Sequence, residues 1–190
     1  MKSVLRAALF SLIFVAGAAP ARQVEGVNVP DAVTLPGVNT PLPLNGAGIR
    51  YKFIVKVYVG ALYLPAPMTS ANAVLDAASP SSVRMFFLHD EVSAAKLVSA
   101  WNDGFASNQS AETLKTLQPR IDQFNALFPT VHSGDVVRLD YIPAVGTQVW
   151  VNDTLRGTIP GTDFRRAMLA IWLGDEPADR DLKKAMLNPK

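Results

Sequence analysis

The side chains with the clearest chemical potential lie in one alternating stretch, residues 49–59. Even positions carry Arg50, Lys52, Ile54, Lys56 and Tyr58, and odd positions carry Ile49, Tyr51, Phe53, Val55, Val57 and Val59. Because side chains of a strand alternate between two faces, this pattern predicts one apolar face and one lined by cations and a phenol. A fixed guanidinium such as Arg50 can receive a carboxylate or an enolate in a cleft. A cationic face is equally typical of a half-covered sheet facing water, and the pattern leaves both interpretations open.

This stretch belongs to a longer predicted strand, residues 44–64, which we expect at the centre of a sheet. The run is too long, too rich in β-branched residues and too regular in its alternation to be a helix. Residues 45–48, Asn-Gly-Ala-Gly, predict a tight bend that delivers Arg50 onto the strand.

Two amphipathic helices are the main predicted partners of this strand. Ser93 is a candidate N-cap for the first, in which Leu97, Trp101 and Phe105 form an apolar stripe with Lys96 beside it. A lysine in this position is commonly no more than a solvent-exposed helix residue. Thr162 is expected to cap the last long helix, whose buried face carries Phe164, Met168, Ile171 and Trp172, and which ends at Gly174.

The other predicted elements complete a mixed α+β domain. Strands are expected at residues 24–29, 83–89, 136–142, 147–151 and 154–159, and short helices at 70–78 and 178–187. Ser110 begins a further helix, which Pro119 must kink or divide.

Several common chemistries lack their residues. The chain has no cysteine, which excludes a thiolate nucleophile and a disulfide scaffold. His89 and His132 have neither metal-ligand spacing nor a carboxylate cluster, so we predict no metal site. The glycines of residues 46–48 precede a strand and lack a third glycine, so a dinucleotide site is not indicated, and no cofactor is expected.

Residues 1–21 are predicted to be a signal peptide that precedes a single domain, residues 22–190. Lys2 and Arg6 form the basic start, an apolar run follows, and we expect cleavage after Ala21. An uncleaved membrane anchor is the alternative, although the run is shorter than the ~20 residues of a spanning helix. Without Lys2 and Arg6 the formal charge of +2 falls to about zero, which gives no basis for nucleic-acid binding. We therefore expect an exported protein, located in a bacterial periplasm.

The order of these elements resembles the chalcone isomerase superfamily, and more closely its exported bacterial chalcone isomerase-like members. Residues 44–50, with Gly-Ala-Gly-x-Arg, are similar to the family signature, and residues 136–159 match its meander in order and length. Lys96 and the Trp172-Leu173-Gly174 end of the late helix add to the resemblance, which spans the whole mature chain. It implies an open-faced β-sandwich in which an antiparallel sheet is covered by a helical layer, with the ligand cleft between them.

The resemblance also implies roles for individual residues. The family arginine corresponds to Arg50 and the lysine to Lys96, whereas Tyr58 occupies the position of the catalytic threonine. The catalytic tyrosine falls on Ser93, the asparagine on Ala100, and a late-helix hydroxyl near Arg165. These departures fall on the positions that polarise the ketone and place water, which should cost several kcal/mol of transition-state stabilisation.

We therefore expect a non-catalytic protein that binds a small amphipathic anion, either a fatty acid or a phenolic compound. Its predicted ligand-binding residues are Arg50, Tyr58, Lys96, Ala100, Arg165 and Leu169. One alternative is an isomerase of chalcone isomerase type, an intramolecular lyase that uses Arg50, Tyr58 and Lys96. The other is a structural or protein-partner module without a ligand, in which Arg50 pairs with an internal carboxylate such as Asp140. The sequence leaves ligand identity and oligomeric state open.

Overall fold

One antiparallel sheet organises the fold in the computed structural model, in which residues 21–189 are described. Its strands are β3 (Ala32–Val33), β4 (Leu42–Lys52), β5 (Val55–Tyr63), β6 (Ser81–Phe87), β9 (Val136–Ile142), β10 (Gly146–Val151) and β11 (Thr154–Ile159). They form a seven-stranded sheet in the order β11-β10-β9-β6-β5-β4-β3. Two smaller pairs accompany it: β1 (Ala21–Val24) with β2 (Val27–Pro30), and β7 (Glu91–Val92) with β8 (Val131–His132).

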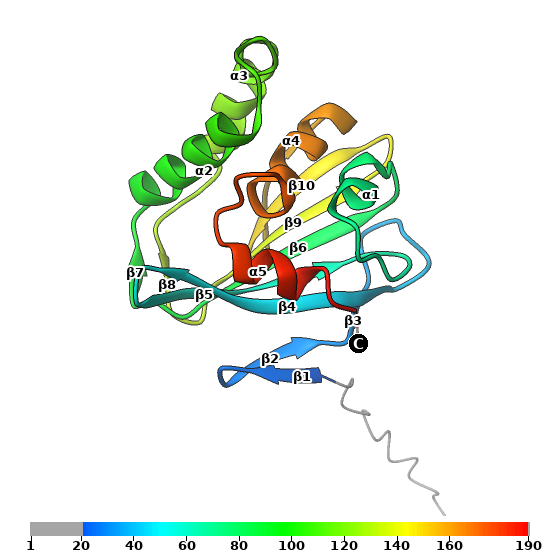
Figure 1. The fold of residues 1–190 in the computed structure, drawn as a ribbon, viewed down its shortest axis with the longest axis vertical. Helices are drawn as coiled ribbons and strands as arrows, with labels where there is room; N and C mark the ends of the chain where they lie inside the picture. The colour runs from blue at the N-terminus through cyan, green and yellow to red at the C-terminus, as the bar shows by residue number, and fades with distance from the viewer. Residues whose placement is uncertain (1–20, 190) are drawn as a thin grey trace, which may run out of the picture.

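A helical layer covers one face of this sheet, as the sequence predicted. It consists of α1 (Ala71–Asp76), α2 (Ala94–Asn108), α3 (Ala111–Asn125), α4 (Thr162–Leu173) and α5 (Arg180–Met186). The β1–β2 hairpin lies on the opposite side of the sheet (Figure 1). The arrangement is an α+β fold in which most of the apolar core lies between sheet and helices.

The predicted single strand over residues 44–64 is wrong: the chain forms the two strands β4 and β5. They are joined by a two-residue turn at Phe53 and Ile54, because Lys52 pairs with Val55. Two antiparallel strands joined by such a turn can carry the same unbroken alternation as one long strand, and Phe-Ile is not a turn signal. Arg50 and Tyr58 consequently lie directly opposite each other on neighbouring strands, on one face of the sheet.

The glycines before Arg50 serve close packing instead of the predicted bend, because they lie inside β4. A Cβ on Gly46 would collide with the backbone carbonyl of Ala185, and one on Gly48 would come within 2.6 Å of the Ala185 Cβ. Both contacts are with α5, which lies against β4 and β5 (Figure 1). The Asn45 side-chain amide fixes this contact by donating to the Met186 carbonyl at 2.7 Å. The Asn-Gly-Ala-Gly segment is therefore a helix-docking site.

The sheet is buried on both faces near β5, so side chains of this strand belong to two separate clusters. Tyr58 and Leu62 join the large helix-side core, in which Trp101 and Phe124 lie 5.9 Å apart between ring centroids. Val59 and Tyr63 join a smaller core that includes Val29 of the β1–β2 hairpin. Side chains of β5 thus alternate between the two faces of the sheet as predicted. After Tyr58, however, both faces are apolar and buried.

The predicted strand over residues 24–29 is wrong, because the chain turns at Glu25 and Gly26 and forms the β1–β2 hairpin. Most other predicted elements are confirmed within a few residues. The Ser93 side chain accepts a hydrogen bond from the Lys96 backbone and caps α2, and α4 ends before Gly174 as predicted. The N-cap of α4 is Gly161, not Thr162, and makes no side-chain capping bond. Pro119 lies inside α3, which continues as one helix.

The predicted signal peptide lies outside the described residues except for Ala21, which is the first residue of β1 and pairs with Pro30. Among residues 21–189, the helices are all too short or too polar to span a bilayer.

Candidate functional site

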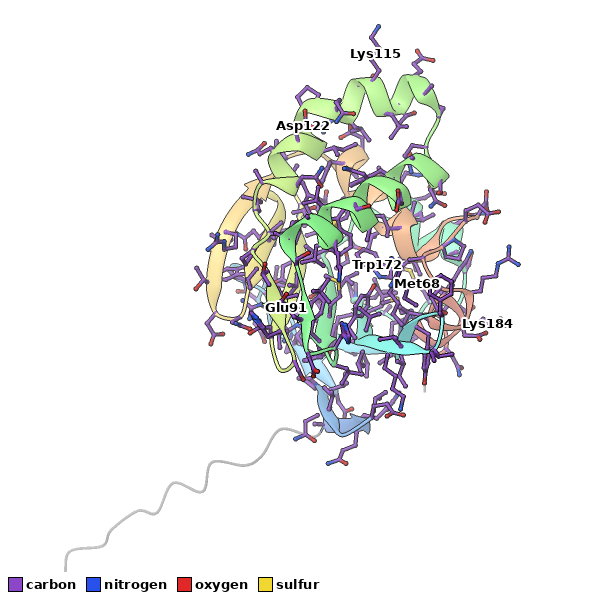
Figure 2. The ribbon with its side chains drawn as sticks, turned by 90° about the vertical axis from the view of Figure 1, so that its left-hand side faces the viewer. Met68, Glu91, Lys115, Asp122, Trp172 and Lys184 are labelled. Carbon is purple, nitrogen blue, oxygen red and sulfur yellow. The ribbon has the colours of Figure 1, made fainter. Side chains whose placement is uncertain are left out.

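A cleft of about 290 Å³ lies between the sheet and the helical layer, at the end of the β4–β5 hairpin. Its wall on the sheet side is formed by Arg50, Val57, Tyr58 and Phe87, and its roof by Leu97, Ala100, Trp101 and Ile171. The rim carries Lys52, Phe53, Val55, His89, Glu91, Val92, Lys96 and Ala178. Figure 2 shows Trp172 of α4 in the interior beneath the helices and Glu91 close to the strands. The cleft is thus mainly apolar, with a few charged groups toward its mouth.

Arg50 brings a guanidinium without a protein partner to this cleft. The side chain is half-buried and its Cζ lies 5.8 Å from the centre of the Tyr58 ring. Within residues 21–189, no carboxylate lies within 4.0 Å of it, and its guanidinium makes no hydrogen bond to the protein. A half-buried cation of this kind is stabilised by an anion, so the geometry of Arg50 is that of a receptor for a negative group.

Tyr58 stands beside Arg50 with its hydroxyl oriented by a tryptophan. The Trp172 indole N–H donates to the Tyr58 hydroxyl oxygen at 2.9 Å. Because an indole N–H can only donate, the Tyr58 oxygen must be the acceptor, and its own O–H proton stays available for another acceptor. Burial raises the pKa of Tyr58 above its ordinary value, against smaller lowering effects of Arg50 and the Trp172 hydrogen bond. The phenol is therefore a neutral hydrogen-bond donor across the physiological pH range.

Lys96 and Ala100 lie where the sequence placed them, on the face of α2 that borders the cleft. Lys96 is exposed at the rim, and Ala100 contributes only a methyl group to the roof. Arg50, Lys52 and Lys96 give the lining three cations, against Glu91, whose carboxylate lies 3.5 Å from the His132 imidazole. The local charge at the mouth is therefore positive.

Arg165 and Leu169, predicted to bind ligand, do not line the cleft. Arg165 is fully buried, and its guanidinium donates to the carbonyls of Val74 and Leu75 at 3.0 and 3.1 Å. These carbonyls belong to the last turn of α1, where backbone acceptors have no partner within the helix. Leu169 is buried in the helix-side core. The correspondence with the family assigned both residues to the cleft side of α4. That assignment is wrong, because α4 faces α1 as well as the cleft.

The sequence interpretation missed the residue that orients Tyr58. Trp172 was assigned only to the buried face of its helix, although a buried indole N–H generally requires an acceptor. That requirement was the available signal, and the acceptor lies 114 residues earlier in the chain. The strand pattern of residues 83–89 likewise gives no sign that the Phe87 ring packs 5.6 Å from the Tyr58 ring and forms part of the sheet-side wall of the cleft.

A ligand-free structural module was expected to pair Arg50 with an internal carboxylate such as Asp140, and this pairing is absent from the described residues. Asp140 lies on the other face of the sheet, where it accepts a hydrogen bond from the Ser82 hydroxyl at 2.6 Å, and it does not pair with Arg50. Within residues 21–189, no group of three or more histidine, aspartate or glutamate side chains is placed to hold a metal ion.

Comparisons with known proteins agree with this architecture. The family model described as chalcone isomerase-like matches residues 21–188. The structure is similar to the crystal structure of a fatty-acid binding protein of Arabidopsis thaliana, with a TM-score of 0.62 and 15% sequence identity, over 85% of this chain and 92% of that one. No curated protein matches the sequence. The likeness to the plant protein is one of fold, and the family match extends over nearly all described residues: the chain belongs to the chalcone isomerase-like family.

Proposed function

We propose that this protein binds a small amphipathic anion, such as a fatty acid, without transforming it. The observation that carries the proposal is the guanidinium of Arg50, which lies 5.8 Å from the centre of the Tyr58 ring at an apolar cleft and has no ion-pair partner among the described residues. A carboxylate matches this pair, because it accepts charge-assisted hydrogen bonds from a guanidinium and a further one from a phenol.

The remainder of the cleft suits an apolar tail. Leu97 and Ala100 on α2, Trp101 beside them and Ile171 on α4 present hydrocarbon or aromatic surface toward the space above Arg50. Enclosed apolar surface with a few placed polar groups is the usual composition of a small-molecule site. Lys96 at the rim adds a long-range attraction for the anion, and its exposure makes this contribution smaller than that of Arg50.

The structurally similar plant protein is a fatty-acid binding protein, which supports this ligand class for the fold. An export signal at residues 1–21, with a periplasmic location after cleavage at Ala21, is proposed on the sequence pattern alone.

The isomerase alternative has Arg50, Tyr58 and Lys96 at the cleft but lacks the family tyrosine and asparagine. The Ser93 hydroxyl accepts the Lys96 backbone N–H as the cap of α2, and Ala100 offers no polar atom. Neither residue can polarise a carbonyl over Arg50 in the way that the family tyrosine and asparagine do. Binding is therefore the better-supported function.

Native mass spectrometry of the gently purified protein, combined with thermal shifts by added dodecanoate, tests the proposal. We expect either a co-purified lipid or a clear rise in Tm in the wild type, and neither in Arg50→Ala. Arg166→Ala is the matched control, because Arg166 is an exposed arginine of α4 whose one ion-pair partner among residues 21–189 is Asp76. A wild type that carries no lipid and shows no shift would contradict the proposal. Chalcone cyclisation faster than in buffer, lost in Arg50→Ala, would establish the isomerase instead.

A further inference from the structure

The turn that joins β4 to β5 presents the most exposed large apolar side chains of the described residues. Phe53 and Ile54 are each 93% exposed, and Tyr51 and Val55 beside them are 41% exposed. The next most exposed, Val145 and Leu155, reach 48% and 44% at separate places in the β9–β11 region. Two adjacent apolar residues that contact almost nothing in their own chain form a patch that calls for an external partner.

The turn also departs from the residue types that its backbone favours. A two-residue hairpin turn selects glycine, asparagine or aspartate, because at least one position has a positive φ. Here that position is Phe53, with a φ of 57°, and an isoleucine follows it. A bulky residue in this conformation costs stability. Because neither side chain packs against the fold, no gain within the chain offsets that cost, and such a violation of a local rule points to a function.

The tip stands at the mouth of the ligand cleft. Lys52, Phe53 and Val55 of the hairpin line the rim together with Lys96 from the start of α2. Figure 1 shows this end of the β4–β5 hairpin beside β7 and β8, at the edge of the sheet. Lys52 and Lys96 have no ion-pair partner among the described residues, whereas Lys56 pairs with Glu25. The apolar tip is thus flanked by cations on the side of the cleft.

We propose that the β4–β5 hairpin tip docks this protein on an anionic lipid bilayer, with Phe53 and Ile54 inserted at the interface. Apolar and aromatic side chains partition into the region between headgroups and acyl chains, and lysines beside them are attracted by anionic lipids. Docking in this way would bring the cleft mouth to the membrane surface. Exchange of an amphipathic ligand between bilayer and cleft rests on the proposed function, whereas the docking itself does not.

A bilayer fits this tip better than a protein partner or a second copy of the chain. Stable protein interfaces bury about 800 Å² on each partner and need a complementary surface. The tip offers two protruding side chains on a narrow turn, which is too little surface for such an interface. A fluid interface needs no preformed complement, and lysines at its edge match the charge of anionic headgroups.

Co-sedimentation with vesicles tests the docking. The wild type should bind vesicles of phosphatidylglycerol and phosphatidylethanolamine in equal parts, and should bind phosphatidylcholine vesicles at least about tenfold more weakly. The double variant Phe53→Asn/Ile54→Gly removes both apolar side chains and places an asparagine, which tolerates a positive φ, at position 53. It should fold with an unchanged or higher Tm while losing about tenfold or more of its vesicle affinity. Lys52→Gln should weaken binding to the anionic vesicles about fivefold and leave binding to the neutral ones unchanged.

The matched control is Val145→Asn/Leu155→Asn, which removes two partly exposed apolar side chains away from the cleft and should keep full vesicle binding. Equal vesicle binding by wild type and Phe53→Asn/Ile54→Gly would overturn the inference, as would a wild type that binds neither kind of vesicle. Concentration-dependent dimerisation that requires Phe53 and Ile54, without vesicle binding, would overturn it in favour of a second copy. Dodecanoate binding by the wild type is measured in parallel without vesicles. A wild type that does not bind dodecanoate contradicts the proposed function, whereas the vesicle measurements still test the docking.

Discussion

Arg50 and Arg165 share a residue type and were both expected to bind ligand, yet the fold places them in opposite situations. Arg165 is fully buried, and α1 and β6 supply acceptors for its guanidinium: two backbone carbonyls and, at 3.3 Å, the Ser81 hydroxyl. Arg50 is half-buried at a cleft, and the described part of the chain supplies no acceptor for it. A guanidinium whose hydrogen bonds are satisfied by the protein holds the fold together, and one left unsatisfied at a cleft is available to a ligand.

This difference also explains why burial alone is a poor guide to function. Burial lowers the pKa of Arg165 to about 10, which still leaves the guanidinium charged at neutral pH. The Tyr141 ring lies 5.3 Å from the Arg165 Cζ, and the Tyr141 hydroxyl shares a hydrogen bond with the Thr162 hydroxyl. The polar groups around Arg165 therefore also have partners within the protein. The more buried arginine is therefore the structural one.

The largest effect that we expect is the loss of stability on replacing Arg165, the arginine whose hydrogen bonds are made within the protein. Arg165→Met keeps an apolar stem but removes the guanidinium donors to the buried carbonyls of Val74 and Leu75. We expect a loss of about 3 kcal/mol or more in the free energy of unfolding. Urea unfolding measures it, with Arg166→Ala on the next, exposed position as a control that should change by less than about 0.5 kcal/mol. A loss as small as that of the control would refute the structural role of Arg165.

Tyr58→Phe tests the role of the residue that lies beside Arg50 at the cleft. The change removes the O–H offered to the ligand, and it also leaves the Trp172 indole N–H without its acceptor. Dodecanoate affinity should fall about fivefold to tenfold, and stability by about 1–2 kcal/mol. Calorimetric titration and urea unfolding of the same sample separate the two effects. Unchanged affinity would show that Tyr58 acts only as a support for Trp172.

Lys96→Gln should have a smaller effect, because Lys96 is exposed and makes no ion pair among the described residues. We expect about a twofold to threefold loss of ligand affinity that disappears at high salt, since screening weakens exposed charges. Titrations at low and high ionic strength measure it. A loss that persists at high salt would mean that Lys96 contacts the ligand directly.

The smallest effect near neutral pH comes from the ionisation of Tyr58. Its pKa is raised by burial in the folded chain, whereas the unfolded chain titrates at about 10. The stability contributed by the buried neutral phenol is therefore fully present below about pH 10 and is lost as pH rises through the folded pKa. Urea unfolding at about pH 8 and about pH 10.5 should show wild type losing stability relative to Tyr58→Phe at the higher pH. An unchanged difference would indicate that Tyr58 ionises equally in both states.

Local sequence patterns predicted the elements that local interactions determine. The Ser93 cap, the apolar stripe of α2 and the three-strand meander each depend on residues close in sequence, and the structure contains all of them. The alternation correctly predicts Arg50 and Tyr58 on one face, but eight residues apart on a single strand. Their position opposite each other across the β4–β5 hairpin could not be predicted, because Phe53 and Ile54 are not residue types that indicate a turn.

The contacts that distinguish the two arginines are all remote in sequence. Arg165 reaches Val74 and Leu75 some 90 residues earlier, and Trp172 reaches Tyr58 across 114 residues. Helical periodicity assigns a residue to a buried face, but it does not say which of several neighbouring elements that face contacts. The cleft side of α4 and its α1 side are therefore indistinguishable in the sequence.

Isothermal titration of dodecanoate into wild type and Arg50→Ala tests whether Arg50 binds the carboxylate of the ligand. Among the described residues, the Arg50 side chain makes no ion pair or hydrogen bond and contacts the Tyr58 ring only at 5.8 Å, so Arg50→Ala should keep its free energy of unfolding within about 1 kcal/mol. We expect saturable binding by the wild type, with affinity reduced at least about tenfold in Arg50→Ala. Equal affinity in a folded Arg50→Ala protein would contradict it, because the carboxylate would then be held elsewhere.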